Sequence, residues 1–250
     1  MHQNPGFVNE QEFVFRLNGK KVGDLSNNLK HIVKEVYGLF NDDEIIKAGF
    51  VENYQKPDIY LEFRGIRKYI SLKSGNATTV AEENIKLFIQ HLRECNISTR
   101  SLKTILYYHF GDGTLNGTGK RRMDYNVLRV KLNKAIYELN RELNENKEFV
   151  KNFVIRSMFK GTRPDNVEAD YIYFGTVEYG VLCSKTQVMK HLDRRSWDYM
   201  ENPHIGPLQF RPHARYVHTI IKSEKRRCAV DIYRANLYAD LTYISSRYDG

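Results

Sequence analysis

The chain has 250 residues, 41% hydrophobic and 28% charged, which excludes a disordered or fibrous protein and suits one or two globular units. Lys and Arg (39) outnumber Asp and Glu (30), so the formal net charge is +9 and a polyanion such as nucleic acid is the expected partner. No apolar stretch approaches roughly 20 residues and no secretory signal is present, so we expect a cytoplasmic protein with no membrane partner. The three cysteines lack a regular spacing, so we expect neither a disulfide framework nor a structural zinc site.

The first predicted elements are a helix over 28–40 and a β-hairpin. Ser26 can cap this helix, and apolar residues recur behind it at helical spacing (Leu29, Ile32, Val33, Val36, Leu39 and Phe40). Short runs rich in Ile, Tyr and Phe predict strands over 59–63 and 68–72, joined by a polar turn. A further strand is expected over 50–54.

The next segment predicts a helix followed by a strand. The stretch VAEENIKLFIQHLRE places apolar residues on one face of a helix over 80–95, where Thr79 and Glu82 fit a capping box. The β-branched and aromatic run over 103–109 predicts a strand. Strand, helix and strand in this order predict a right-handed parallel crossover.

The C-terminal part is also predicted to be α+β. Its expected elements are helices over 125–143 and 148–159, strands near 171–174 and 180–183, a helix capped by Ser184 and ending near 192, and strands over 215–221 and 228–233. Glycine and basic residues concentrate within 111–124, which is either a domain boundary or a functional loop inside one domain. We therefore expect one domain over 1–122 and another over 123–250.

The stretch KPDIYLEFRGIRKYISLKSG (56–75) carries the residues suited to catalysis. Asp58 begins the first strand of the hairpin and Lys73 ends the second, so antiparallel pairing brings them to the same end of the sheet. In phosphodiester hydrolysis, carboxylates hold Mg²⁺, the metal activates a water molecule, and a lysine orients or deprotonates that water. The alternative interpretation is a surface hairpin with a proline at a strand entry and solvated charges.

This stretch resembles the PD-(D/E)xK nuclease superfamily, with Pro57-Asp58 as the first half of the motif and Ser71-Leu72-Lys73 in place of the second. The resemblance covers about 26–110. It implies an α/β (α+β) protein with a restriction-endonuclease-like mixed central sheet flanked by helices, here followed by an α+β C-terminal extension. It also implies a metal-dependent endonuclease that uses Mg²⁺ or Mn²⁺ and acts on DNA rather than RNA, with Asp58 and Lys73 as catalytic residues.

Ser71 departs from the motif, because the superfamily normally has Asp or Glu there. Some restriction enzymes of this superfamily carry a serine at that place and supply the acid from the following helix, which implies Glu82 or Glu83 as the further metal ligand. On a helical wheel Glu82 lies about 70° from the apolar centre and Glu83 lies nearly opposite it. The first helix supplies another acid in this superfamily, and Glu35 is its candidate here.

Two basic segments are candidates for nucleic-acid contacts. The loop GDGTLNGTGKRR does not fit the phosphate-binding pattern G-x-x-x-x-G-K-[ST], but its cations can bind phosphates without reading sequence. The segment IGPLQFRPHAR joins basic residues to an aromatic one. The expected contacts are Lys120, Arg121 and Arg122 in the loop and Arg211, His213 and Arg215 in the segment. In both cases an ordinary ordered loop is the competing interpretation.

Two other functions remain open from the sequence. Ser71 is compatible with a catalytically inactive protein of the same fold that binds nucleic acid or a partner protein. An interaction protein unrelated to nucleic acid is also compatible with the composition. If the chain does cleave both strands of DNA, a homodimer is expected, because a single active site cuts one strand.

Overall fold

The computed structural model describes residues 5–52, 56–74, 79–119, 122–163, 165–197, 202–213, 224–233 and 237–248. The chain divides into two compact units, the first made of 1–77, 155–191 and 238–250 and the second of 78–154 and 192–237. The expected boundary between 122 and 123 lies inside the second unit. There α4 (Thr99–Phe110) and α5 (Tyr125–Glu145) pack together across it, and Ser98 N and Ser101 Oγ both donate hydrogen bonds to Glu142.

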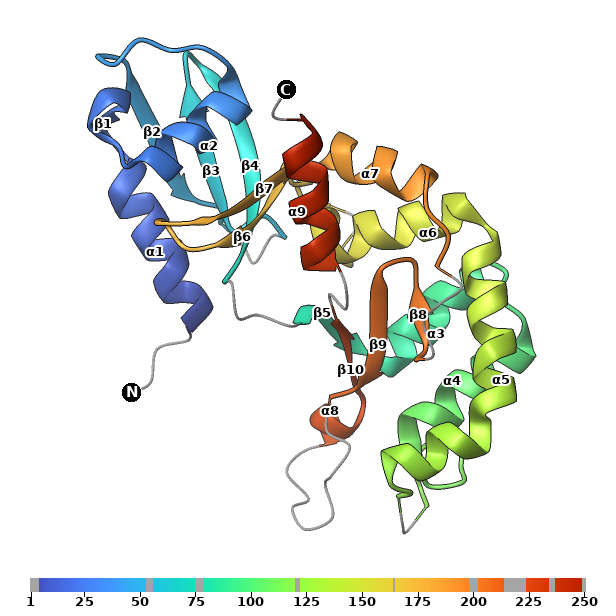
Figure 1. The fold of residues 1–250 in the computed structure, drawn as a ribbon. Coiled ribbons are helices and arrows are strands. Elements are labelled where there is room, and N and C mark those ends of the chain that lie inside the picture. Colours follow the sequence, from blue (N-terminus) through green and yellow to red (C-terminus); the bar gives the residue numbers. More distant parts are fainter. Residues whose placement is uncertain are drawn as a thin grey trace. The chain divides into compact units, whose positions relative to one another are not determined.

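The first unit is built on a mixed six-stranded sheet with the order β1-β2-β3-β4-β6-β7 (Figure 1). Its strands are β1 (Lys20–Lys21), β2 (Ile45–Phe50), β3 (Ile59–Phe63), β4 (Ile66–Lys73), β6 (Tyr171–Gly175) and β7 (Gly180–Ser184). Neighbouring strands are antiparallel except β4 and β6, which are parallel. The sheet therefore brings the predicted hairpin β3–β4 to its centre.

The hairpin follows from its turn and its alternating side chains. Arg64 and Gly65 have φ angles of 51° and 76°, as a two-residue type I′ turn requires. The register then pairs Phe63 with Ile66 and Ile59 with Ile70. Alternate residues of β3 are buried, which directs Ile59, Leu61 and Phe63 into the core and leaves the polar positions on the other face.

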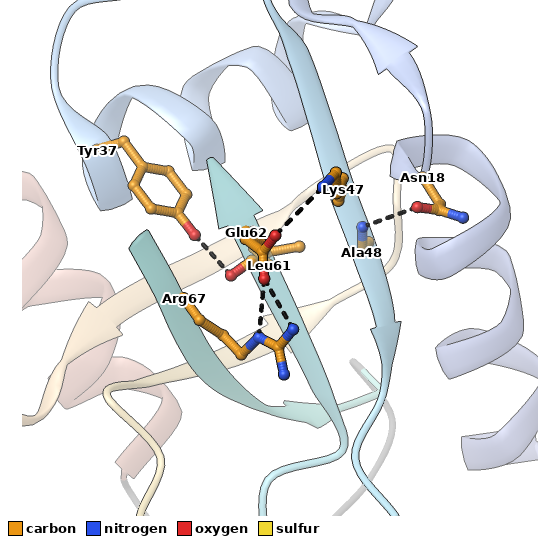
Figure 2. Close-up of polar contacts among 7 residues, drawn as sticks. All are labelled: Asn18, Tyr37, Lys47, Ala48, Leu61, Glu62 and Arg67. Carbon is orange, nitrogen blue, oxygen red and sulfur yellow. Dashed lines mark hydrogen bonds and ion pairs between the residues drawn. The ribbon is translucent and has the colours of Figure 1, made fainter. Parts of the chain in front are cut away.

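Polar contacts fix the strands of this sheet to one another and to the helices (Figure 2). Glu62 on β3 accepts hydrogen bonds from Lys47 on β2 and Arg67 on β4, and the bonds from Arg67 hold the pKa of Glu62 below its usual value. Tyr37 Oη donates to the carbonyl oxygen of Leu61 at 2.7 Å. Glu62 and Arg67 are partners in the β3–β4 register, so their ion pair fits the pairing that places the ends of β3 and β4 side by side.

Two helices, α1 (Pro5–Leu17) and α2 (Asn27–Tyr37), pack on one face of this sheet. Phe13 of α1 meets Tyr173 of β6 edge to face at 5.1 Å between ring centroids. The predicted helix over 28–40 is confirmed as α2, whereas α1 was not predicted. The remaining helical elements of this unit are the 3₁₀ turn Val22–Asp24, the π-helical turn Ile155–Lys160, α7 (Lys185–Asp193) and α9 (Leu237–Tyr248).

The second unit contains a separate antiparallel sheet with the order β5-β10-β9-β8. Its strands are β5 (Thr79–Asn84), β10 (Ala229–Tyr233), β9 (Leu208–Pro212) and β8 (His204–Ile205). Its helices are α3 (Ile85–Glu94), α4, α5, α6 (Lys147–Val154) and α8 (Glu224–Arg227). Phe88 packs against Phe153 and Phe210 in the core, which joins helices and sheet. Among the described residues, no helix is long and apolar enough to cross a membrane.

Of the predicted elements of this unit, the helix over 80–95 forms only from Ile85 onwards, as α3, and the strand over 103–109 is wrong. The segment 79–84 is strand β5 because it pairs with β10, and the helix begins only at Ile85, where the side chain of Asn84 accepts a hydrogen bond from Lys86 N. The run over 103–109 is part of α4. The side chain of Ser98 caps that helix, and Leu102, Ile105 and Tyr108 are buried at helical spacing. The expected crossover between 68–72 and 103–109 therefore does not form.

Most other predicted elements are confirmed in type. The helices expected over 125–143 and 148–159, the strands near 171–174, 180–183 and 228–233, and the helix capped by Ser184 all form. Of the strand expected over 50–54, Phe50 is the last residue of β2, Val51 and Glu52 are not in a strand, and 53–54 lie outside the described residues. The strand expected over 215–221 lies outside the described residues.

Candidate active site

The first unit gathers polar side chains where β3 begins and β4 ends. Asp58 precedes β3, and its backbone N–H donates to Ile70 O at 3.0 Å, so it lies across from Ser71. Oδ2 of Asp58 accepts hydrogen bonds from Ser71 Oγ at 3.2 Å, Leu72 N at 2.5 Å and Lys73 Nζ at 3.5 Å. Antiparallel pairing thus joins the two halves of the motif.

These side chains are shielded from solvent. Ser71 is fully buried, and the side chains of Lys73 and Asp58 are 16% and 19% exposed. Lys73 Nζ also donates to Leu72 O at 2.9 Å. An ion pair with so little exposure is weakly screened, so the charges of Asp58 and Lys73 act strongly on neighbouring groups.

Glu10 is a neighbouring carboxylate that the sequence analysis missed. Burial, and next the negative charge of Asp58, raise the pKa of Glu10 from 4.5 to about 7, while Lys73 lowers it. Glu10 stands one turn before the buried Phe13, on the face of α1 that packs on the sheet. The sequence feature that could have identified Glu10 is a carboxylate on the apolar face of an amphipathic helix.

Lys56 is a second lysine within electrostatic reach of this cluster. Burial is the main cause that lowers the pKa of Lys56 from 10.5 to about 7; the charge of Lys73 lowers it further and that of Asp58 opposes this. A lysine with such a pKa is partly neutral near pH 7 and can accept a proton. No pattern in the sequence distinguished Lys56 from an ordinary lysine before a proline.

The other expected acids belong to other elements. Glu35 is exposed on α2, and its charge is one of the smaller causes that raise the pKa of Tyr171, after burial. Glu82 and Glu83 belong to strand β5 of the second unit, not to the start of a helix. There Glu82 is exposed and contacts His213, whereas Glu83 is buried.

The expected nucleic-acid contacts are only partly described. Lys120, Arg121 and Arg215 lie outside the described residues. Arg122 is partly buried. The other two contact their own unit, because the guanidinium of Arg211 stacks on the ring of Tyr233 at 3.4 Å and His213 pairs with Asp231.

The donor set of the first unit fits a hard divalent cation such as Mg²⁺. Among the described residues, every hydrogen bond accepted by the side chain of Asp58 goes to Oδ2, so Oδ1 is available as a ligand. Glu10 offers further carboxylate oxygens next to this charge. A divalent cation would compensate the repulsion between the two carboxylates and lower the raised pKa of Glu10.

Neither a protein-family model nor a curated protein sequence matches this chain. Among solved structures, the chain is similar to a crystal structure of the restriction endonuclease MspI in complex with its cognate DNA. The TM-score is 0.50 and the sequence identity 12%, and the similarity covers 91% of this chain and 88% of that chain. At this identity the similarity concerns the fold alone, and it shows that the chain has the restriction-endonuclease-like fold expected from the motif.

Proposed function

We propose that the first unit hydrolyses phosphodiester bonds of DNA with Mg²⁺ or Mn²⁺ bound by Asp58 and Glu10. The observation that carries this proposal is the pairing of Asp58 with Lys73 where β3 begins and β4 ends, with Glu10 within electrostatic reach of both. The net charge of +9 favours a polyanionic substrate. The fold shared with a DNA-bound restriction endonuclease favours DNA over RNA.

The bound metal would polarise the scissile phosphate and lower the pKa of the attacking water. Asp58 holds its carboxylate in one orientation, because Ser71 Oγ and Leu72 N anchor Oδ2. Ser71 is therefore a positioning residue. Lys73 places a positive charge beside Asp58, where it can orient the water and neutralise the phosphate.

Lys56 is the proposed proton acceptor. Its neutral form can take a proton from the attacking water, since its pKa of about 7 matches neutral conditions. Glu10 supplies the second carboxylate, so this proposal does not require Glu82, Glu83 or Glu35 as metal ligands.

The test is cleavage of supercoiled plasmid DNA and of a single-stranded RNA, with Mg²⁺ and with EDTA. The wild type is expected to cut DNA only with the metal. Asp58→Asn and Lys73→Met are expected to lower the rate by roughly 100-fold or more, the range for groups that act on the transition state. Equal cleavage by all three proteins, or cleavage in EDTA, would exclude the proposal.

Matched control variants come from other elements of the same unit. Glu12 is an exposed carboxylate on α1 that pairs with Arg16, and Lys47 is an exposed lysine on β2 that pairs with Glu62. Glu12→Gln and Lys47→Met are expected to cleave at the wild-type rate. A loss as large as that of Asp58→Asn would show that activity responds to net charge and not to this site.

A DNA-binding protein without nuclease activity is the second candidate, favoured by Ser71 in the place where the superfamily has an acid. Calorimetry distinguishes the two functions, since a nuclease should take up Mg²⁺ or Mn²⁺ through Asp58 and a silent binder should not. DNA binding that weakens steeply with added salt would support phosphate contacts in either case.

A further inference from the structure

One face of the second unit's sheet carries two carboxylates directly opposite each other. Glu82 on β5 pairs in register with Asp231 on β10, the strand between β5 and β9. Like charges in this position destabilise an antiparallel pair. His213 directly follows β9, and its backbone N–H donates to Ala229 O on β10 at 2.9 Å. Its side chain contacts both carboxylates.

One atom of each side chain faces a common point. His213 Nδ1 lies 2.9 Å from Asp231 Oδ1 and 3.4 Å from Glu82 Oε2, and the three atoms all lie within 4.8 Å of one another. Around an ion with bonds of about 2.0–2.1 Å, neighbouring ligand atoms lie about 2.9 Å apart in an octahedron and about 3.4 Å apart in a tetrahedron. The two spacings from His213 Nδ1 span this range, so the three atoms are close enough to ligate one ion after a small rearrangement.

Further contacts hold the cluster in this arrangement. Tyr233 Oη donates to Asp231 Oδ2 at 3.2 Å, so Oδ1 is the oxygen that turns to His213. The side chain of Asp231 is only 8% exposed, whereas those of Glu82 and His213 are 50% and 34% exposed. Arg211, opposite Asp231 on β9, stacks on the ring of Tyr233. A buried, oriented ligand with two accessible ones is suited to capture an ion from solvent.

We propose that Glu82, His213 and Asp231 bind a transition-metal ion of the Zn²⁺ class. One imidazole nitrogen and two carboxylates favour Zn²⁺ over Mg²⁺, which prefers oxygen ligands alone. Without metal, Nδ1–H of His213 donates to Asp231. On binding, the metal–nitrogen bond replaces this hydrogen bond, and the neutral imidazole that binds the metal carries its proton on Nε2. Three protein ligands leave a position for water. These ligands belong to the second unit and Asp58 and Glu10 to the first, so the proposal does not depend on the proposed nuclease activity.

The test is competition for Zn²⁺ between the full-length protein and a chromogenic chelator, in excess Mg²⁺. The wild type is expected to bind one Zn²⁺ per chain. His213→Ala and Asp231→Asn are expected to weaken binding at least about 100-fold, and Tyr233→Phe about tenfold through loss of the bond to Asp231. The controls His31→Ala, an exposed histidine on α2, and Asp58→Asn should bind like the wild type.

Zn²⁺ affinity unchanged in His213→Ala, or lost equally in His31→Ala, would overturn the proposal. Co²⁺ substitution of the wild type gives a readout that does not depend on a folded variant. A visible Co²⁺ spectrum of a mixed nitrogen and oxygen shell, together with a shifted NMR signal of one histidine, is expected. Co²⁺ binding without any change in the histidine signals would also exclude the site.

Discussion

Replacing Glu10 by Gln is expected to stabilise the metal-free protein at alkaline pH, because the native fold holds this carboxylate where its charge is unfavourable. Burial and Asp58 raise the pKa of Glu10 from 4.5 to about 7. The folded state therefore binds a proton more tightly than the unfolded state in this window, and stability falls as the pH rises through it. The whole shift corresponds to roughly 3 kcal/mol, which solvent screening of this partly exposed group reduces to about 1–2 kcal/mol.

The assay is urea unfolding of the wild type and Glu10→Gln in EDTA at about pH 8 and about pH 5. The variant should gain about 1–2 kcal/mol in free energy of unfolding at the higher pH and markedly less at the lower pH, where the native Glu10 is mostly protonated. Saturating Mg²⁺ should reverse the order. The wild type gains about 2.7 kcal/mol at 100 times the dissociation constant, and the variant gains less.

Glu12→Gln is the matched control, because Glu12 is exposed on the same helix and pairs with Arg16. It should show neither the gain at high pH nor the loss of stabilisation by Mg²⁺. The prediction is refuted if Glu10→Gln is no more stable than the wild type at about pH 8 in EDTA, since the negative charge of Asp58 would then not act on Glu10. It is equally refuted if both proteins gain the same stability from Mg²⁺.

Three other substitutions test the same region. The cleavage rate of the wild type at saturating Mg²⁺ should rise through about pH 7, because the neutral fraction of Lys56 rises there, and Lys56→Met should flatten this rise. A dependence of the cleavage rate on pH identical to that of the wild type would contradict the role of Lys56. Ser71→Ala removes the hydrogen bond to Asp58, which should lower the free energy of unfolding in urea by about 1 kcal/mol and weaken Mg²⁺ binding in calorimetry. An unchanged free energy of unfolding together with an unchanged Mg²⁺ affinity would show that this hydrogen bond is dispensable. Gly65→Ala forces a side chain into a turn residue with φ of 76° and should cost roughly 1 kcal/mol in thermal unfolding, whereas no loss would mean that the turn has another geometry.

The second unit is largely an insertion between β4 and β6, two adjacent parallel strands of the first unit. Between these adjacent strands the chain runs from 74 to 170, and most of the second unit is inserted in this connection. The catalytic candidates Asp58, Ser71 and Lys73 lie before the insertion. The candidate zinc ligands lie on a sheet that the inserted β5 forms with strands from much later in the chain.

The sequence by itself determined the hairpin, its motif and several helices. Local rules suffice there: alternation selects the face of β3, and spacing together with antiparallel pairing brings Asp58 to Lys73. The basic composition likewise follows from counting residues. These features depend on neighbours within a few residues or across one short turn.

Only the tertiary structure decided which further residues surround the motif. VAEEN has a helical pattern of apolar residues, but β10, far along the chain, pairs with it as a strand. The segment 103–109 has the composition of a strand, yet the packing of α4 against α5 buries one helical face. Glu10 and Lys56 acquire their shifted pKa values from burial and from charges brought close by folding. Such effects have no local signature in the sequence, because desolvation depends on what the whole fold packs around a group.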